Sequence, residues 1–292
     1  MSEIIQRMHD LLAERCGYPA PEGLAARRAG QRAALDAYPE QECRLPDDRG
    51  GKLRALRFNP DGAGRGTVIH WGGGGYRLGC LEYAAPFAEV LAAACDVEVI
   101  CPYYRLAPEH PFPAGLNDGL AAIAAVLAQG RGRLILSGDS AGGGLAASLA
   151  AICTKRNITL AGVMLLSPWL DLTIASPCYA ENAASDPIFS REAASEAAEQ
   201  YLQGHFPSDP LASPLFANIQ NFPSTYQCIG SGEVLAADAR GFHERLIAAG
   251  CCSRLSVIPE MEHVAVMRDW NLTGSTQVIE EVADFVHDRI SC

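Results

Sequence analysis

The chain has 292 residues, 49% of them hydrophobic, so it is long enough to bury a large core as one or two domains. Its formal net charge of −11 argues against nucleic acid or an anionic membrane surface as a partner. It contains no apolar run of ~20 residues that would span a membrane, and it lacks the basic start and apolar core of a signal peptide. The eleven cysteines show no Cys-x-x-Cys spacing, which favours reduced thiols in a cytoplasmic protein.

Apolar strand patterns alternate with helical patterns along most of the chain. Strands are predicted at residues 53–58, 67–71, 97–101, 134–137, 163–167, 226–230 and 255–258. Helices are predicted at residues 115–129, 141–155, 236–249 and 275–290. Strands separated by helices in this way predict an α/β fold, with a mostly parallel central sheet flanked by helices on both faces.

Two segments fall outside this alternation. Residues 1–40 carry two helical patterns, and residues 178–208 contain an Ala/Glu-rich helix after Asp186, with Ser190 placed to cap it. In parallel-sheet folds, ligands bind at the carboxyl ends of the strands. We therefore expect both segments to form a small helical cap over that edge, within one domain spanning residues 1–292. Surface helices unrelated to the site are the alternative.

Residues 138–142 read Gly-Asp-Ser-Ala-Gly, at the junction of a predicted strand and a predicted helix. The pattern Gly-x-Ser-x-Gly in this context is typical of a nucleophile elbow, where the serine occupies a strained turn between a strand and a closely packed helix. Side chains at the two glycine positions would collide with their neighbours. Ser140 is therefore the candidate nucleophile.

A serine hydroxyl needs a base that removes its proton as it attacks. Three histidines lie beyond residue 222: His243, His263 and His287. His243 and His287 fall within predicted helices, where a solvated helix surface is their ordinary place. His263 follows the strand 255–258 on a loop at the correct end of the sheet, and it is the predicted base.

A carboxylate on the loop after strand 226–230 would hold the far ring nitrogen of that histidine. Glu233 is the first acidic residue on this loop, and Asp238 follows five residues later, near the start of a predicted helix. Glu233 is the preferred acid and Asp238 the alternative. Either residue is also explained as a helix-start carboxylate that the helix dipole favours.

Four consecutive glycines, residues 72–75, follow the strand 67–71. Bare backbone N–H groups can approach a developing negative charge, so two of these amides and the N–H of Ala141 would form a three-donor oxyanion hole. A glycine-rich loop can also cradle phosphate, but the chain has no Gly-x-Gly-x-x-Gly and no Gly-Lys-Ser/Thr sequence.

From about residue 67 to residue 263, the chain resembles the hormone-sensitive-lipase-like branch of the α/β-hydrolase carboxylesterases. The sequences that carry the resemblance lie at residues 73–76, 104–109, 138–143, 167–169, 209–214 and 233–235. It implies an α/β-hydrolase fold with an N-terminal helical cap, and a soluble or cytoplasmic esterase that uses no metal or organic cofactor. It also supports Ser140, Glu233 and His263 as the catalytic triad.

The same resemblance, aligned on Tyr76, implies Gly74 and Gly75 as the oxyanion glycines. Relatives usually begin this loop with His-Gly-Gly-Gly, whereas here Gly72 occupies the histidine position and His70 stands two residues earlier. Gly73 therefore remains an alternative oxyanion donor.

These residues predict a serine carboxylesterase that hydrolyses esters with acyl chains of about two to eight carbons, by family analogy. The alternatives are an amidase or arylformamidase, a lactonase or an acyltransferase on the same triad, and a non-catalytic small-molecule receptor. Receptors of this fold tend to lose the triad histidine, which this chain retains. The expected partner is a small-molecule ester, with a homodimer as one arrangement that the sequence leaves open.

Overall fold

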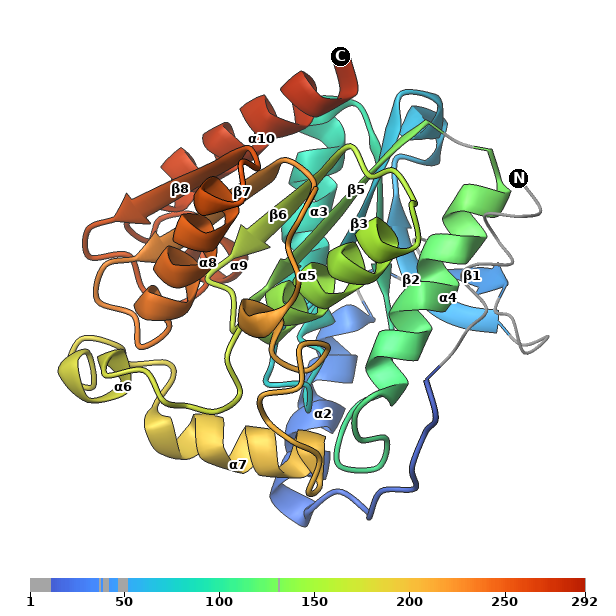
Figure 1. Cartoon of the computed structure of the whole chain (residues 1–292). Helices are drawn as coiled ribbons and strands as arrows, with labels where there is room; N and C mark the ends of the chain where they lie inside the picture. The colour runs from blue at the N-terminus through green and yellow to red at the C-terminus, as the bar shows by residue number, and fades with distance from the viewer. Residues whose placement is uncertain (1–11, 37, 39–41, 47–51, 131, 292) are drawn as a thin grey trace.

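The structure is a computed structural model that describes residues 12–36, 38, 42–46, 52–130 and 132–291. In this part of the chain, eight strands form one sheet in the order β1-β2-β4-β3-β5-β6-β7-β8 (Figure 1). The strands from β4 to β8 in this order are parallel, and β2 is antiparallel to both its neighbours. The bounds are β1 Glu42–Pro46, β2 Lys52–Phe58, β3 Gly66–Trp71, β4 Glu98–Pro102, β5 Arg133–Asp139, β6 Gly162–Leu166, β7 Thr225–Gly230 and β8 Ser253–Ile258.

Helices cover both faces of the sheet, because its central strands are apolar on both sides. Neighbouring residues of β3 show this alternation: Val68 packs in one buried cluster and Ile69 in the other. The Val68 side is covered by α3 (Leu81–Cys95) and α10 (Ser275–Ser291). The Ile69 side is covered by α4 (Ala114–Ala128), α5 (Ser140–Lys155) and α8 (Ala236–Ala248). The predicted α/β fold is confirmed.

Two elements of this layout, β1 and α3, were not predicted. β1 is a short edge strand that contains charged residues, so it lacks the apolar run used to recognise the others. α3 contains Pro86, which ordinarily interrupts a helix by removing one backbone donor. Its Phe87 and Leu91 are nevertheless fully buried against the sheet, and this packing outweighs the local penalty. The remaining short helices are η2 (Pro60–Gly64), α6 (Cys178–Glu181), η3 (Pro214–Phe216) and α9 (Ala265–Arg268).

Two further helices, α2 (Glu22–Leu35) and α7 (Arg191–Leu202), lie at the lower end of the molecule in Figure 1. Arg28 of α2 donates hydrogen bonds to the carbonyl oxygens of Arg77 (2.7 Å) and Ala107 (2.5 Å), on the loops that follow β3 and β4. Tyr201 of α7 stacks on Tyr76 with ring centroids 3.9 Å apart. Both helices therefore contact the carboxyl edge of the sheet.

The helix expected in residues 178–208 is α7, and the Ser190 hydroxyl caps it by accepting a hydrogen bond from the Ala193 N–H at 3.2 Å. The first helical pattern expected in residues 1–40 falls almost wholly on residues 1–11, which lie outside the described residues. The second pattern is α2.

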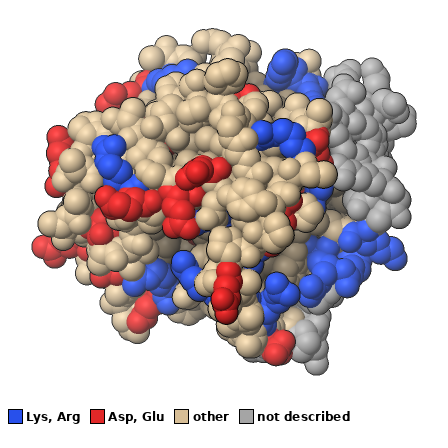
Figure 2. All heavy atoms as spheres, turned by 90° about the horizontal axis from the view of Figure 1, so that it is seen from below, with Lys and Arg blue, Asp and Glu red and all other residues tan. Residues whose placement is uncertain are grey.

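Figure 2 views the molecule from the side on which α2 and α7 lie. Acidic side chains gather near the middle of this face and also lie along its edge, and basic side chains are scattered around them, with a group at the right (Figure 2). On α7, the side chains of Glu192, Glu196 and Glu199 are exposed. None of the helices that the structure describes combines the length and the apolar character needed to cross a membrane.

Candidate active site

Ser140 lies at the junction where β5 ends and α5 begins. Its φ of 49° is in the left-handed region, which a non-glycine residue occupies only at a strained turn. A Cβ atom at Gly138 would lie 2.2 Å from the Gly142 oxygen, and one at Gly142 would lie 1.9 Å from the Trp71 oxygen. Neither position can carry a side chain without moving backbone, so the two glycines permit the tight turn that holds Ser140.

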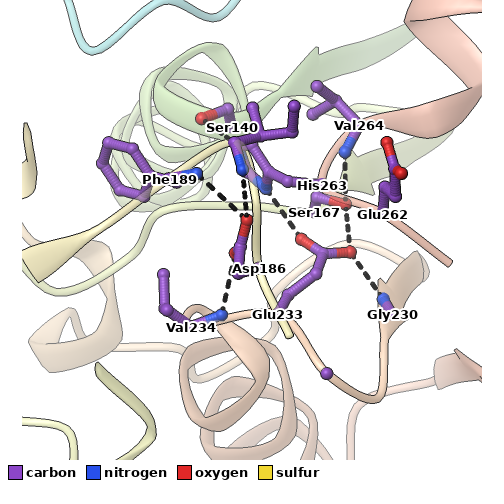
Figure 3. A network of polar contacts seen from close by, with 12 residues as sticks. Ser140, Ser167, Asp186, Phe189, Gly230, Glu233, Val234, Glu262, His263 and Val264 are labelled. Carbon is purple, nitrogen blue, oxygen red and sulfur yellow. Dashed lines mark hydrogen bonds and ion pairs between the residues drawn. The ribbon is translucent and has the colours of Figure 1, made fainter. Parts of the chain in front are cut away.

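Three predicted side chains meet at this turn (Figure 3). The Nε2 atom of His263 lies 3.0 Å from the Oγ of Ser140, and its Nδ1 lies 2.7 Å from an Oε of Glu233. Ser140, His263 and Glu233 are 6%, 4% and 1% exposed. They come from the elbow, the loop after β8 and the loop after β7, so the topology brings together residues that are far apart in sequence.

The second carboxylate oxygen of Glu233 is held by two donors. It accepts hydrogen bonds from the Gly230 N–H at 2.6 Å and from the Ser167 hydroxyl at 2.9 Å. The Ser167 oxygen in turn accepts a hydrogen bond from the Val264 N–H, next to His263, at 3.3 Å (Figure 3). Both carboxylate oxygens are therefore fixed, one toward the imidazole and one toward the surrounding backbone.

The pKa of the His263 imidazole is raised. Burial lowers this pKa, but the hydrogen bond and charge of Glu233, together with the charges of Asp186 and Asp139, outweigh that effect. The ordinary value for histidine is about 6.5. The site therefore favours the imidazolium form that arises when the histidine accepts a proton.

Asp238 lies in α8, and its contacts are with a different part of the chain. One of its carboxylate oxygens accepts hydrogen bonds from the N–H groups of Leu170 and Asp171, both at 2.9 Å. Burial raises its pKa to about 7, and the charge of Asp171 adds to this. The structure thus brings Glu233, and not the alternative acid Asp238, to His263.

The glycine loop after β3 presents its amides unequally. The Gly73 N–H donates a hydrogen bond to the Asp139 carboxylate at 3.1 Å. Gly74 and Gly75 have φ values of 91° and 62°, and neither N–H donates a hydrogen bond to another described residue. Ala141 is in the first turn of α5, where N–H groups have no acceptor within the helix. The N–H groups free to donate a hydrogen bond to a ligand are therefore those of Gly74, Gly75 and Ala141, and not that of Gly73.

Two polar side chains hold this loop at and beside Gly72. The Tyr104 hydroxyl donates a hydrogen bond to the Gly72 carbonyl at 2.8 Å. His70 is fully buried, with Nε2 3.3 Å from the Asp139 carboxylate that also binds Gly73. The loop is thus anchored on both sides despite the glycine at position 72.

Comparison with known proteins places this chain in a family. A family model described as an alpha/beta hydrolase fold matches residues 68–267. The chain belongs to the α/β-hydrolase family. This hydrolase is 35% identical over 201 residues to an acetyl-hydrolase of Streptomyces hygroscopicus, covering 68% of this chain and 67% of that protein. It is 30% identical over 265 residues to an esterase of Acinetobacter venetianus, covering 86% and 88%.

Solved structures extend the similarity to nearly the whole hydrolase. It is similar to an esterase from the bacterial hormone-sensitive lipase family, with a TM-score of 0.83, 31% identity and coverage of 99% of this chain and 96% of that one. It is also similar to EstE5, in a crystal soaked with p-nitrophenyl butyrate, with a TM-score of 0.83, 27% identity and full coverage of both chains. The resemblance to the hormone-sensitive-lipase-like branch is confirmed.

Two residues near the site in this hydrolase were not singled out from the sequence as parts of it. The Phe189 ring stacks on the His263 imidazole, with centroids 5.7 Å apart and an interplanar angle of 15°. The Asp186 carboxylate accepts hydrogen bonds from backbone on two segments. The sequence marked Asp186 only as a residue that precedes a predicted helix. That position does not distinguish a structural carboxylate from a functional one.

Proposed function

We propose that this hydrolase is a serine carboxylesterase acting on small esters with short acyl chains. The observation that carries the proposal is the buried Ser140–His263–Glu233 chain, with contacts of 3.0 and 2.7 Å, beside a loop with free amides. Relatives named esterase, carboxylesterase and acetyl-hydrolase support the same reaction class. In this proposal Ser140 is the nucleophile, His263 the base and Glu233 the acid that orients it.

In the first step, the Ser140 oxygen attacks the ester carbonyl while His263 Nε2 takes the hydroxyl proton. The negative charge that develops on the carbonyl oxygen is stabilised by the N–H groups of Gly74, Gly75 and Ala141. Removing one such donor costs about 3–4 kcal/mol of transition-state stabilisation in comparable sites. Glu233 keeps the other ring proton on Nδ1 and stabilises the imidazolium.

In the second half of the reaction, the His263 imidazolium gives its proton to the leaving alcohol, and the acyl group stays on the Ser140 oxygen. Water then attacks this acyl-enzyme while the same imidazole removes a proton from it. The tetrahedral oxyanion forms again in front of the same amides, and its collapse releases the carboxylic acid and restores the serine. The chain's own residues therefore account for every proton transfer.

We also propose that α2 and α7 form a cap that limits the size of the acyl group. A Cβ atom at Gly75 would lie 3.1 Å from the Cβ of Ala197, so α7 packs directly over the oxyanion loop. A helix this close to the reacting carbonyl favours a small acyl group over a long one. The cysteines among the described residues are free, four of them buried, and this agrees with the expected cytoplasmic location.

The test is hydrolysis of p-nitrophenyl acetate, butyrate, octanoate and palmitate by the wild type and by the Ser140→Ala variant. We expect turnover of the short esters, little or no turnover of palmitate, and loss of nearly all turnover in the variant. Turnover of palmitate above butyrate would contradict the short-chain proposal. A folded wild type without turnover on any of the four esters would favour an amidase or a small-molecule receptor.

A further inference from the structure

The segment of residues 182–189, between α6 and α7, is bonded to the loop that carries the proposed acid. The Asn182 side-chain amide donates a hydrogen bond to the Glu233 carbonyl at 2.7 Å. The Ser185 hydroxyl donates one to the Gly232 carbonyl at 2.8 Å. These contacts join the Glu233 backbone to a segment about 50 residues earlier in the chain. We call residues 182–189 the clamp segment.

Asp186 links this clamp segment to the loop that carries Glu233. One of its carboxylate oxygens accepts hydrogen bonds from the N–H groups of Ile188 (3.1 Å) and Phe189 (3.0 Å). The other accepts one from the N–H of Val234, at 3.0 Å (Figure 3). The Asp186 side chain is buried, at 7% exposed. A single carboxylate therefore fixes both the turn that leads into Phe189 and the residue next to Glu233.

Phe189, the residue that this turn positions, lies against the proposed base. Its ring stacks on the His263 imidazole, and it also meets the Trp169 ring in an edge contact, with ring centroids 5.4 Å apart at 71°. The imidazole is thus confined by Phe189 on one ring face and by the Glu233 carboxylate at Nδ1. Movement of the clamp segment would displace both of these contacts together.

We propose that Asp186 is a positioning residue for catalysis. It holds Glu233 and Phe189 in place against His263 while the imidazole takes up and returns its proton. The inference rests on the proposed esterase function. Catalysis of this kind depends on alignment, since a displacement of about 1 Å can cost roughly 10²-fold in rate. Asp186 touches no reacting atom in this account and acts through the two residues that it holds.

The charge of Asp186 also raises the pKa of the His263 imidazole. The charged groups that face His263 are Glu233 from the loop after β7, Asp186 from the clamp segment and Asp139 from the end of β5. Each favours the imidazolium, so removing the Asp186 charge must lower the pKa of His263. A carboxylate too far from the imidazole to interact with its charge would leave this pKa unchanged.

The experiment uses the Asp186→Asn variant of the full chain. An asparagine has one acceptor oxygen, so it cannot serve Val234 on one side and the Ile188–Phe189 turn on the other. Asp171→Asn is the matched control. Asp171 is also 7% exposed, and its carboxylate accepts a hydrogen bond from the Thr173 N–H at 2.8 Å. It is not among the charges that raise the pKa of His263. Asn182→Ala removes one clamp contact without changing a charge.

The readouts are kcat and KM for p-nitrophenyl butyrate per serine titrated with diethyl p-nitrophenyl phosphate, and the pH dependence of kcat/KM. For Asp186→Asn we expect kcat to fall by about 10- to 100-fold with a much smaller change in KM, and the acid limb to move to lower pH. Asn182→Ala should lower kcat and leave the acid limb in place, and Asp171→Asn should match the wild type in both.

Wild-type kcat and an unmoved acid limb in a folded Asp186→Asn variant would overturn the inference. If this variant does not fold, Asn182→Ala decides, because wild-type kcat there would show that the clamp contacts do not position the acid. A wild type without Ser140-dependent turnover would instead refute the proposed function, which is a separate outcome.

Discussion

The proposed role of Glu233 predicts a large and specific effect of the Glu233→Gln substitution. The carboxylate oxygen that faces the Gly230 N–H, at 2.6 Å, must remain an acceptor, because a backbone N–H can only donate. The glutamine oxygen therefore takes that place, and the glutamine NH₂ group faces His263 Nδ1. That nitrogen must then accept a hydrogen bond, which moves the ring proton to Nε2, beside Ser140.

With its proton on Nε2, the imidazole cannot take the serine proton. In serine hydrolases, the corresponding wrong tautomer lowers kcat by about 10⁴-fold, equivalent to about 5.5 kcal/mol in the activation free energy. We expect a loss of this size in Glu233→Gln, measured as kcat with p-nitrophenyl butyrate at saturating ester. The substitution leaves the side-chain volume nearly unchanged, so the fold should be retained in circular dichroism.

Asp238→Asn is the matched control for this loss. Asp238 lies on the same stretch of chain and is equally buried, but its hydrogen bonds go to Leu170 and Asp171. An asparagine oxygen can still accept both, so kcat should stay close to that of the wild type. The reasoning is refuted if Glu233→Gln keeps more than about a tenth of wild-type kcat, or if Asp238→Asn shows the larger loss.

Three further measurements test other parts of the account. Because the pKa of His263 is raised and the base must be neutral, kcat/KM should increase with pH and reach half its maximum above about pH 6.5; a flat profile from about pH 5 to 9 would contradict the assignment. The pKa of Asp238 in the folded protein is about 7, above its unfolded value, so its ionised form destabilises the fold at high pH. In urea denaturation, Asp238→Asn should therefore stabilise the protein by up to roughly 4 kcal/mol at pH 8 and by much less at pH 5. An equal gain at both pH values would refute this. Gln227 is fully buried, and neither its amide oxygen nor its amide nitrogen is hydrogen-bonded to a described residue. Gln227→Met should therefore raise the free energy of unfolding by about 1–3 kcal/mol. An unchanged or lower value in the same assay would count against this.

The parts of this molecule that are set by short stretches of sequence could be predicted. The elbow around Ser140 is defined by five contiguous residues, and the buried parallel strands by continuous apolar runs, so the fold class followed from local pattern. The N-terminal capping residue of α7, Ser190, was also predictable, because it and the first turn of the helix are neighbours in sequence. α3 was missed because its packing, and not its local sequence, makes Pro86 tolerable.

Beyond the triad contacts, the hydrogen bonds between distant segments could not be predicted from the sequence. Glu233 and Asp238 are both acidic and close together, and only the geometry shows that one faces His263 while the other bonds the backbone of Leu170. The Asp186–Val234 hydrogen bond joins residues 48 positions apart, and no local pattern marks it. The same holds for Gly73, whose N–H is occupied by a carboxylate that lies 66 positions along the chain.

The most direct test of the central claim is to identify the residue that carries the covalent intermediate. The wild type is treated with one equivalent of diethyl p-nitrophenyl phosphate, and its peptides are analysed by mass spectrometry while esterase activity is followed. We expect one diethylphosphoryl group on Ser140, in proportion to the loss of activity, and no labelling of Ser140→Ala. Full inactivation with Ser140 unmodified, or a Ser140→Ala variant that hydrolyses p-nitrophenyl butyrate as fast as the wild type, would contradict the account.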